Sequence, residues 1–420
     1  MNLFIRQQNH IKSLIILMIS STTLMAFQSD LGIYIQKARE NNPSLKRAKT
    51  QWQSAEVNIA VAKGLANPTV SVGYFLESVE TAAGPQQYKI GLTQKFPFLG
   101  KRKLQGKIQA SKAETSYFNY VFHQLKLDHE VRLTWYDYYY LARVTELTVQ
   151  NFKLIQNWDG VIRSKYVTAR TGHPDLIKTQ IELIQLEDEL FTLENKKIPI
   201  LERFRTLLND PSLIDIVVPD SLAFELGQSD KSIIQGQILK NNPNILGVKA
   251  AIEMERTKVK RSKLNRMPDI GLGVELIGTG EKDGSSISGK DPLVAKLSMD
   301  IPIWFRKTNS EITSANYTLT GAEARAESIQ NELRSELEMV LFDLDESSRQ
   351  IRLYKDILIP KGLESLSASE IAYRGDKIGF ISLVDAQRRL LQFQMKYEKA
   401  VVDYLKAKSK LSVLTGEKQS

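Results

Sequence analysis

The side chains that most often carry metal or acid-base chemistry are few and widely spaced in this chain. His123 and His129 lie six residues apart, so they do not share one face of a helix. The acidic run 187–189 is typical of a solvated helix surface. We find no nucleophile beside a base, no paired-carboxylate site and no phosphate-binding loop. The sequence therefore predicts a protein that is not an enzyme and that holds no metal ion or cofactor.

Two short segments share the layout of a tight turn that opens a helix. The segments 166–183 and 373–390 align at an offset of 207 residues, which places Tyr166 on Tyr373. Both contain glycines, which adopt the backbone conformations of tight turns without strain: these are Gly172, Gly375 and Gly379. Apolar residues follow in heptads, the spacing of a coiled coil. The sequence predicts two helical hairpins, with their ends at about 166–176 and 373–383.

The composition indicates a folded chain with a large core. Of its 420 residues, 42% are hydrophobic and 25% are charged, which fits neither a disordered chain nor a helical membrane protein. The net charge of +9 is spread along the chain, so a solvated helical surface explains it better than nucleic-acid binding. The absence of cysteine excludes disulfides, thiolate metal sites and a lipidated cysteine.

The N-terminal segment has the layout of a secretory signal peptide. Arg6 and Lys12 precede the apolar run 14–19, and the small residue Ala26 follows at a plausible cleavage point. The alternative is a membrane anchor, but the apolar run is too short to span a bilayer comfortably. We therefore expect residues 1–26 to direct export and to be removed.

Four segments alternate apolar and polar residues with the period of a β-strand. We expect strands at about 68–80, 87–97, 268–278 and 292–303. Their lengths match the roughly 9 to 11 residues of a tilted membrane strand. Four strands cannot close a barrel, and open edges are unfavourable in an apolar medium. Several chains are therefore expected to contribute strands to one barrel; the alternative is a soluble hairpin packed on helices.

Long helices are predicted after each pair of strands, and each is expected to end at one of the two turns. They cover about 101–170 and 306–373, or roughly 105 Å at about 1.5 Å per residue. Shorter helices return from the turns; we expect a kink at Pro199 in the first, and one possible strand at 214–218 after it.

An internal two-fold repeat is predicted from the order of these features. The triplet Asn41-Asn42-Pro43 recurs 200 residues later as Asn241-Asn242-Pro243. Each half then continues with a β-hairpin, a long helix, a turn and a return helix. We expect the repeats to cover residues 27–219 and 220–420.

This order, duplication and spacing resemble the TolC family of outer membrane efflux ducts. The resemblance is carried by the two Asn-Asn-Pro triplets, Pro68 and Pro268 before the strands, the segments 96–102 and 301–307 after them, and the twin turns. It implies a homotrimer with a twelve-stranded barrel in the outer membrane and a long α-helical periplasmic tunnel. The segments 96–102 and 301–307 look most like the heavy-metal-efflux branch, typified by CzcC and CusC.

The resemblance also implies a transport role and partners. Such a duct passes a heavy-metal cation or drug passively from an inner-membrane pump and a periplasmic adaptor across the outer membrane. Two other classes remain open, a periplasmic adaptor and a structural coiled-coil envelope protein. An adaptor predicts one hairpin flanked by β-rich halves, and a structural coiled coil leaves the alternating strands unexplained.

Roles for individual residues follow from the same resemblance. Asp385 resembles one position of the acidic ring that holds the periplasmic mouth of the family closed, and the neighbouring ring position is Ser382 here, which implies a thinner ring. Asp175 and Tyr373 resemble a pair that links the two hairpins. The alternatives are that Asp175 caps the helix after Pro174 and that Asp385 lies on a solvated face. The adaptor is expected to dock on the turns, which are represented by Tyr166, Gly172, Gly375 and Gly379.

Overall fold

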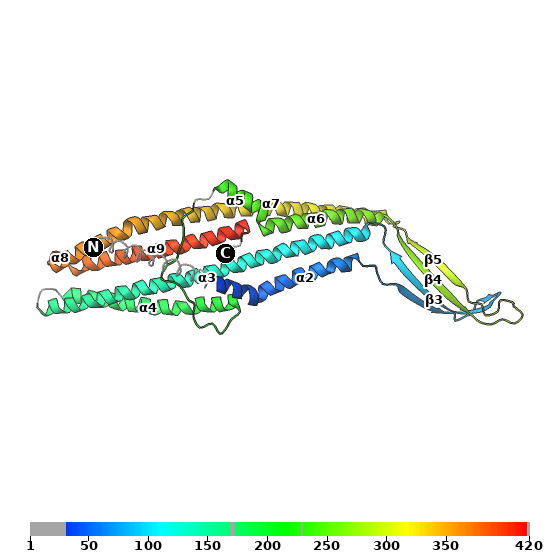
Figure 1. Cartoon of the computed structure of the whole chain (residues 1–420), viewed down its shortest axis with the longest axis horizontal. Helices are drawn as coiled ribbons and strands as arrows, with labels where there is room; N and C mark the ends of the chain where they lie inside the picture. Colours follow the sequence, from blue (N-terminus) through cyan, green and yellow to red (C-terminus); the bar gives the residue numbers. More distant parts are fainter. Residues whose placement is uncertain (1–30, 169–172, 228–229, 418–420) are drawn as a thin grey trace, which may run out of the picture. The chain divides into compact units, whose positions relative to one another are not determined.

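The computed structural model describes residues 31–168, 173–227 and 230–417 and is mainly helical (Figure 1). The expected signal peptide, 1–26, and Gly172 lie outside these residues. The helices are residues 31–41, α2 (Pro43–Lys63), α3 (Lys101–Val167), α4 (His173–Leu208), α5 (Lys231–Asn241), α6 (Pro243–Lys263), α7 (Phe305–Arg352), α8 (Ile359–Arg374) and α9 (Phe380–Thr415). A 3-10 turn, η1 (Leu264–Arg266), follows α6, and a π-helical segment, η2 (Leu353–Leu358), joins α7 to α8.

The described residues form two compact units, and each contains parts of both halves of the sequence. Unit 1 holds residues from 31–47, 121–242 and 331–417. Unit 2 holds 48–120 and 243–330, which include all the strands. The units therefore do not correspond to the two predicted repeats, which remain a prediction.

The bounds of several helices recur at fixed offsets. Helix 31–41 and α2 have counterparts in α5 and α6 that begin and end 200 residues later. The return helices α4 and α9 begin and end 207 residues apart. The same local sequence signals thus start and stop helices in both halves.

The Asn-Asn-Pro triplets break each short helix in the same way. Proline favours the first position of the new helix, where no backbone N–H is needed. The Asn42 carboxamide accepts hydrogen bonds from the N–H groups of Ser44 and Leu45 at 3.0 and 3.1 Å. Its Nδ2 donates to the carbonyl of Leu207 at the end of α4, at 2.9 Å. In the second half, Asn242 donates equivalently to Leu414 at the end of α9, at 2.8 Å. Each triplet thus also satisfies a carbonyl at a helix end.

The strands form one antiparallel sheet in the order β1-β3-β4-β5, with β2 paired to β3. Their bounds are β1 (Thr69–Tyr74), β2 (Glu80–Thr81), β3 (Gly84–Phe96), β4 (Asp269–Thr279) and β5 (Leu293–Asp300). Two predicted strands were too long. β1 ends at Tyr74, where its pairing with Tyr88 of β3 stops. β5 ends before Pro302, which lacks an N–H for the ladder.

The second long helix differs from the uninterrupted helix that we predicted. Whereas α3 is continuous over 67 residues, the path from α7 to α8 passes through η2. Pro360 follows η2 and cannot donate a backbone hydrogen bond, and its ring disfavours the regular α-helical turn before it. The N–H of Ile359 instead bonds the carbonyl of Tyr354, five residues earlier, which is the π-helical pattern. Pro199, by contrast, lies within α4 without ending it.

The connection between the halves is held by aromatic side chains. The predicted strand at 214–218 is irregular, because side chains rather than a neighbouring strand bond its backbone. Trp135 Nε1 donates to the Val217 carbonyl at 3.1 Å, and the Tyr404 hydroxyl donates to the Glu225 carbonyl at 2.8 Å. Most aromatic side chains of the run 135–140 are buried.

Candidate functional site

The ends of the two helical hairpins pack together within unit 1. We call the buried residues at this contact the hairpin-end cluster: Ile155 and Ile162 of α3, Leu186 of α4, Tyr373 of α8, and Phe380, Leu383 and Val384 of α9. The Phe380 ring lies edge to face with Trp158 at 6.1 Å and 5.8 Å from the Tyr373 ring. Such aromatic contacts add to the stabilisation from burial alone. The second hairpin therefore ends against the face of the first.

A lysine at the end of α3 links the hairpins at their turns. Lys165 Nζ lies 2.6 Å from the Asp376 carboxylate and donates to the Tyr373 carbonyl at 3.2 Å. The same ammonium lies 4.4 Å from the centroid of the Tyr373 ring, within the range of a cation-π interaction. Because Asp376 is well exposed, its ion pair with Lys165 is expected to add little stability by itself.

Two further polar contacts join the hairpins farther from the turns. Glu182 on α4 is buried and accepts a hydrogen bond from Arg388 Nε on α9 at 3.0 Å. This hydrogen bond is the main reason that the pKa of Arg388 is raised. Gln387 donates to Asn151 on α3 at 2.9 Å, and both side chains are buried. No local pattern in the sequence marks these contacts, although Glu182 lies one helical turn before Leu186 on the buried stripe.

The predicted pair of Asp175 and Tyr373 lies in one neighbourhood, but the expected hydrogen bond is not formed. Tyr373 is 8% exposed, and its hydroxyl has no hydrogen-bond partner among the described residues. Burial, followed by the charges of Asp175 and Asp376, raises the pKa of Tyr373. The phenol is therefore held neutral and keeps its proton available for donation. Asp175 also lies in the first turn of α4, where a carboxylate is favoured by the helix dipole.

The two predicted ring positions lie on an exposed face of α9. Ser382 and Asp385 are both exposed, one helical turn apart. Arg389 Nε donates to Asp385 Oδ2 at 3.1 Å, within the same helix. This arginine offsets part of the negative charge at the position of Asp385.

The residues predicted at the turns have different environments. Gly375 ends α8 and Gly379 precedes α9, so both mark the second turn. Tyr166 is 42% exposed, and its ring packs 5.7 Å from that of His173. The first turn therefore presents an aromatic side chain to its surroundings, whereas Tyr373 at the second turn is buried.

The sheet of unit 2 has one apolar and one polar face. Register places the apolar side chains together and leaves them exposed: Val70, Val72 and Tyr74; Tyr88, Ile90, Leu92 and Phe96; Ile270, Leu272, Val274 and Leu276; Leu293, Leu297 and Met299. The opposite face carries small residues together with Lys89, Lys296 and Glu275, and the last two form an ion pair. β1 and β5 each have one neighbour in the sheet, so each leaves an open edge.

The described part of the chain contains neither a candidate membrane-spanning helix nor a candidate metal cluster. No helix there combines the length and apolarity needed to cross a bilayer. Nor do the described residues bring together three or more side chains that could hold a metal ion. The features that could carry function there are the hairpin-end cluster and the two-faced sheet.

Comparisons with known proteins agree with this geometry. Residues 234–417 match the family model described as outer membrane efflux protein. The fold is similar to that of CusC, at 12% identity and a TM-score of 0.78 over 92% of both chains. It is also similar to the outer membrane protein VceC of Vibrio cholerae, at 15% identity and a TM-score of 0.75 over 94% of this chain and 98% of that one. A third similar structure is the MtrE outer membrane channel of Neisseria gonorrhoeae, at 16% identity and a TM-score of 0.74 over 92% and 89%. No curated protein sequence matches the chain.

Proposed function

We propose that this protein is a passive exit duct of a tripartite efflux system, because residues 234–417 match the family model of outer membrane efflux proteins and the described chain shares its fold with outer membrane channels. The duct would be a homotrimer in the outer membrane with a periplasmic extension, and it would perform no catalysis. The observation that carries this proposal is the sheet, whose apolar face is exposed on four strands and whose two edges are open. Three copies would supply twelve strands to one closed barrel, with the apolar face toward lipid.

Complementary stripes on two helices support self-association. Exposed apolar residues follow α4 at helical spacing: Ile177, Ile181, Ile184, Phe191 and Ile198. Others follow the outgoing helix of the second hairpin: Ile357, Leu363 and Ile371. Ile184 lies eleven residues after the start of α4, and Leu363 lies eleven residues before the end of α8. Because Lys165 and Asp376 hold the two turns at one level, these positions can face each other between neighbouring copies.

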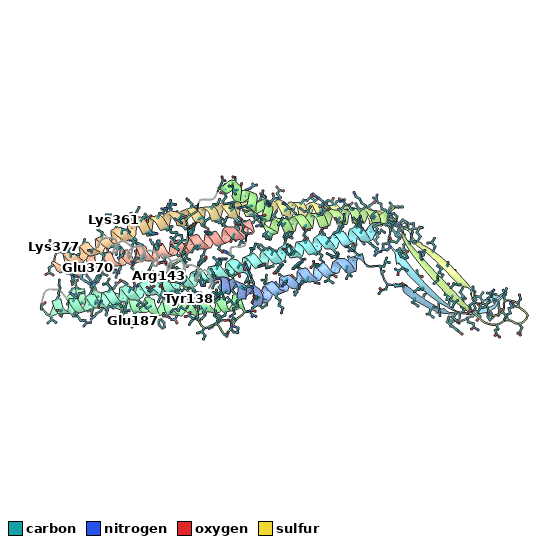
Figure 2. The ribbon with its side chains drawn as sticks, viewed as in Figure 1. Tyr138, Arg143, Glu187, Lys361, Glu370 and Lys377 are labelled. Carbon is teal, nitrogen blue, oxygen red and sulfur yellow. The ribbon has the colours of Figure 1, made fainter. Side chains whose placement is uncertain are left out.

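Charges beside the stripes are also complementary. Glu187 on α4 lies at nearly the same distance from its turn as Lys361 on α8, and Lys178 lies at nearly the same distance as Glu370. Figure 2 labels Glu187, Lys361 and Glu370 on their helices. Opposite charges at matched positions favour one register between two antiparallel helices.

Disulfide cross-linking can test this assembly without background, because the chain has no cysteine. Ile184→Cys combined with Leu363→Cys should give covalent trimers in membranes under mild oxidation. The matched control, Ile184→Cys with Phe342→Cys, places the second thiol at an exposed position of α7 and should give none. A membrane-extracted protein that migrates as a monomer, with no cross-linked species, would contradict the proposed duct.

The hairpin ends are proposed to form the periplasmic gate. Asp385 and Ser382 would face the lumen, while Tyr373 and Asp175 would tie the hairpins in the closed state. Asp385→Ala is expected to raise single-channel conductance or reduce cation preference, because it removes a lumen carboxylate. The control Asp159→Ala removes an acidic residue paired with Arg163 on α3. Unchanged conductance and selectivity in Asp385→Ala would argue against the gate role.

An adaptor is proposed to dock on the turns, at Tyr166 and Gly172 of the first hairpin and at Gly375 and Gly379 of the second. Substrate would arrive from an inner-membrane pump through this adaptor. The segments 96–102 and 301–307 and the likeness to CusC favour the heavy-metal branch. Deleting the gene should then sensitise cells to heavy-metal cations; sensitivity to drugs alone would assign the duct to drug efflux.

A further inference from the structure

The segment that joins β5 to α7 contains a groove with an apolar and a cationic part. The groove is lined by Ile303, Trp304, Phe305, Arg306, Lys307 and Ser310. Trp304 is 72% exposed and Phe305 is 67% exposed, although both are large apolar side chains. Neither Arg306 nor Lys307 forms an ion pair with another residue in the described part of the chain. The groove is therefore not occupied by this chain's own side chains.

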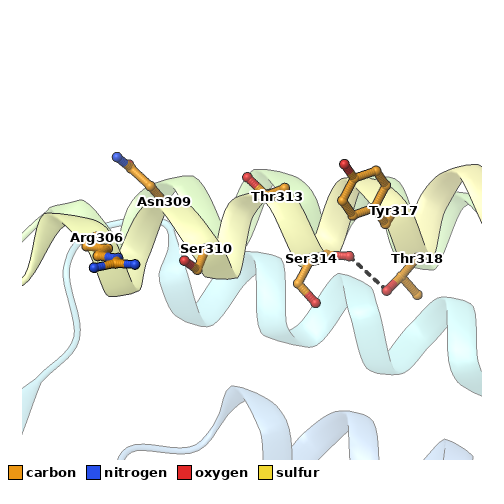
Figure 3. Close-up of a pocket in the computed structure, with 7 residues that line it drawn as sticks. All are labelled: Arg306, Asn309, Ser310, Thr313, Ser314, Tyr317 and Thr318. Carbon is orange, nitrogen blue, oxygen red and sulfur yellow. Dashed lines mark hydrogen bonds between the residues drawn. The ribbon is translucent and has the colours of Figure 1, made fainter.

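The groove continues along α7 as a row of polar side chains. An adjoining pocket shares Arg306 and Ser310 and adds Asn309, Thr313 and Tyr317 (Figure 3). All the residues drawn in Figure 3 come from α7, so one helix presents a guanidinium, a carboxamide and hydroxyls together. Guanidinium and hydroxyl groups are the usual protein partners of phosphate oxygens.

The counterpart at the end of β3 is built differently. There, Leu99 is 87% exposed, like Trp304, but the cations that follow are used within the protein. Lys101 is bonded to Asp269 at 2.8 Å, and Arg102 donates to the Lys63 carbonyl at 3.2 Å. The two junctions thus share an exposed apolar side chain, whereas only the second leaves its two cations available.

The position of the groove indicates which kind of molecule it would bind. It follows β5, whose apolar side chains belong to the exposed face of the sheet. If that face contacts lipid, the groove lies where hydrocarbon gives way to headgroups. Tryptophan concentrates at such boundaries, and lysine and arginine beside it attract anionic headgroups.

We propose that the groove formed by Trp304, Phe305, Arg306 and Lys307 binds an anionic phospholipid of the membrane leaflet that borders the helices. Trp304 and Phe305 pack against the upper acyl chains, and Arg306 and Lys307 pair with the phosphate. Asn309 and Ser310 supply further hydrogen-bond donors to the headgroup. This inference rests on the proposed function, because it requires the sheet to be inserted in a bilayer.

Spin-labelled lipids test the charge preference of the full-length protein in phosphatidylcholine vesicles. We expect labelled phosphatidylglycerol to associate more strongly than labelled phosphatidylcholine. Arg306→Gln with Lys307→Gln should reduce that preference by at most about fivefold for each cation removed. Arg306→Lys with Lys307→Arg keeps both charges and should retain the preference. The matched control Lys153→Gln with Lys377→Gln removes two exposed cations of unit 1 and should also retain it.

Tryptophan quenching tests the apolar part. The fluorescence lost in Trp304→Phe should be quenched by phospholipids brominated near the carbonyl end of the acyl chains, and less by those brominated near the methyl end. No quenching of Trp304 by either lipid would mean that a neighbouring copy covers the groove and would overturn the proposal. An unchanged lipid preference in the double glutamine variant would do so as well. Protein that fails to insert into vesicles would instead refute the proposed duct.

Discussion

The two hairpin ends use the same positions in different environments. The ring pair of Tyr166 and His173 lies 207 residues before the equivalent pair of Tyr373 and Phe380. The ring centroids are 5.7 Å apart in the first pair and 5.8 Å apart in the second. Phe380 is 1% exposed, because it packs against Trp158 of the first hairpin. His173 and Tyr166 are exposed. The second hairpin is thus anchored inside its own chain, whereas the first keeps its ring pair accessible to other molecules.

Truncating the equivalent rings of Phe380 and His173 should give the largest difference in stability between the two hairpin ends. Phe380→Ala is expected to lower the free energy of unfolding by about 3 to 5 kcal/mol, because it leaves a cavity in the hairpin-end cluster. His173→Ala should change it by less than about 0.5 kcal/mol, since the ring is exposed. Denaturant unfolding in detergent measures both; equal losses would contradict the anchored and accessible assignments.

Mild acid is expected to lower the stability of the protein through His129 of the first hairpin, because the second half of the sequence contains no histidine. Burial, with smaller contributions from Lys410 and Arg132, lowers the pKa of His129 from 6.5 to about 4. Between these values the unfolded chain binds the proton more readily than the folded one, so stability falls as the pH drops from 6.5 to about 4. The loss should reach at most about 3 kcal/mol.

Thermal unfolding across this pH range measures the effect of His129. His129→Gln should flatten the pH dependence, whereas His173→Gln, at the exposed turn, should leave it unchanged. If His129→Gln keeps the full pH dependence, another group is responsible for it.

The buried contact between Glu182 and Arg388 should matter more than its neighbour on α9. Glu182→Gln is expected to cost about 1 to 3 kcal/mol, because it weakens a charge-assisted bond at a buried position. Arg389→Gln should cost less than about 0.5 kcal/mol, since that arginine forms an exposed pair with Asp385. Hydrogen exchange of α9 measures local opening. Partial recovery in Glu182→Arg with Arg388→Glu would support a direct interaction, and equal effects at Arg388 and Arg389 would argue against it.

The smallest expected difference lies between the two Asn-Asn-Pro junctions. Asn42→Ala and Asn242→Ala each remove a bond to a helix-end carbonyl and should each cost about 1 to 2 kcal/mol. Because the contacts correspond, the two losses should agree within about 0.5 kcal/mol. A much larger loss at one junction, measured by thermal unfolding, would show that the halves differ there in more than sequence.

The sequence predicted the features that local signals encode. The Asn-Asn-Pro triplets place the helix breaks, and apolar alternation places the four main strands. The ends of β1 and β5 were missed because the end of a strand depends on where its pairing with the neighbouring strand stops. η2 was missed because one proline, Pro360, left the heptad pattern around it intact.

The candidate site was predicted less completely. Tyr373 and Asp175 were expected to form a linking hydrogen bond, and the Tyr373 hydroxyl has no partner among the described residues. Their role in joining the hairpins stays a prediction. The contacts of Lys165 with Asp376 and of Glu182 with Arg388 join residues more than 200 positions apart. Nothing local marks such pairs, since a buried glutamate resembles an exposed one until the opposing helix is placed.

The π-helical segment η2 determines how far α8 is rotated about the helix axis relative to α7. Each residue of an α-helix turns the following side chains by about 100° around the axis. A hydrogen bond that spans five residues instead of four accommodates an extra residue, so η2 sets the azimuth of α8 relative to the part of α7 that precedes it. Tyr373 points into the hairpin-end cluster only at the azimuth that α8 now has. The inward direction of this phenol is therefore fixed fifteen residues earlier, where η2 ends at Leu358.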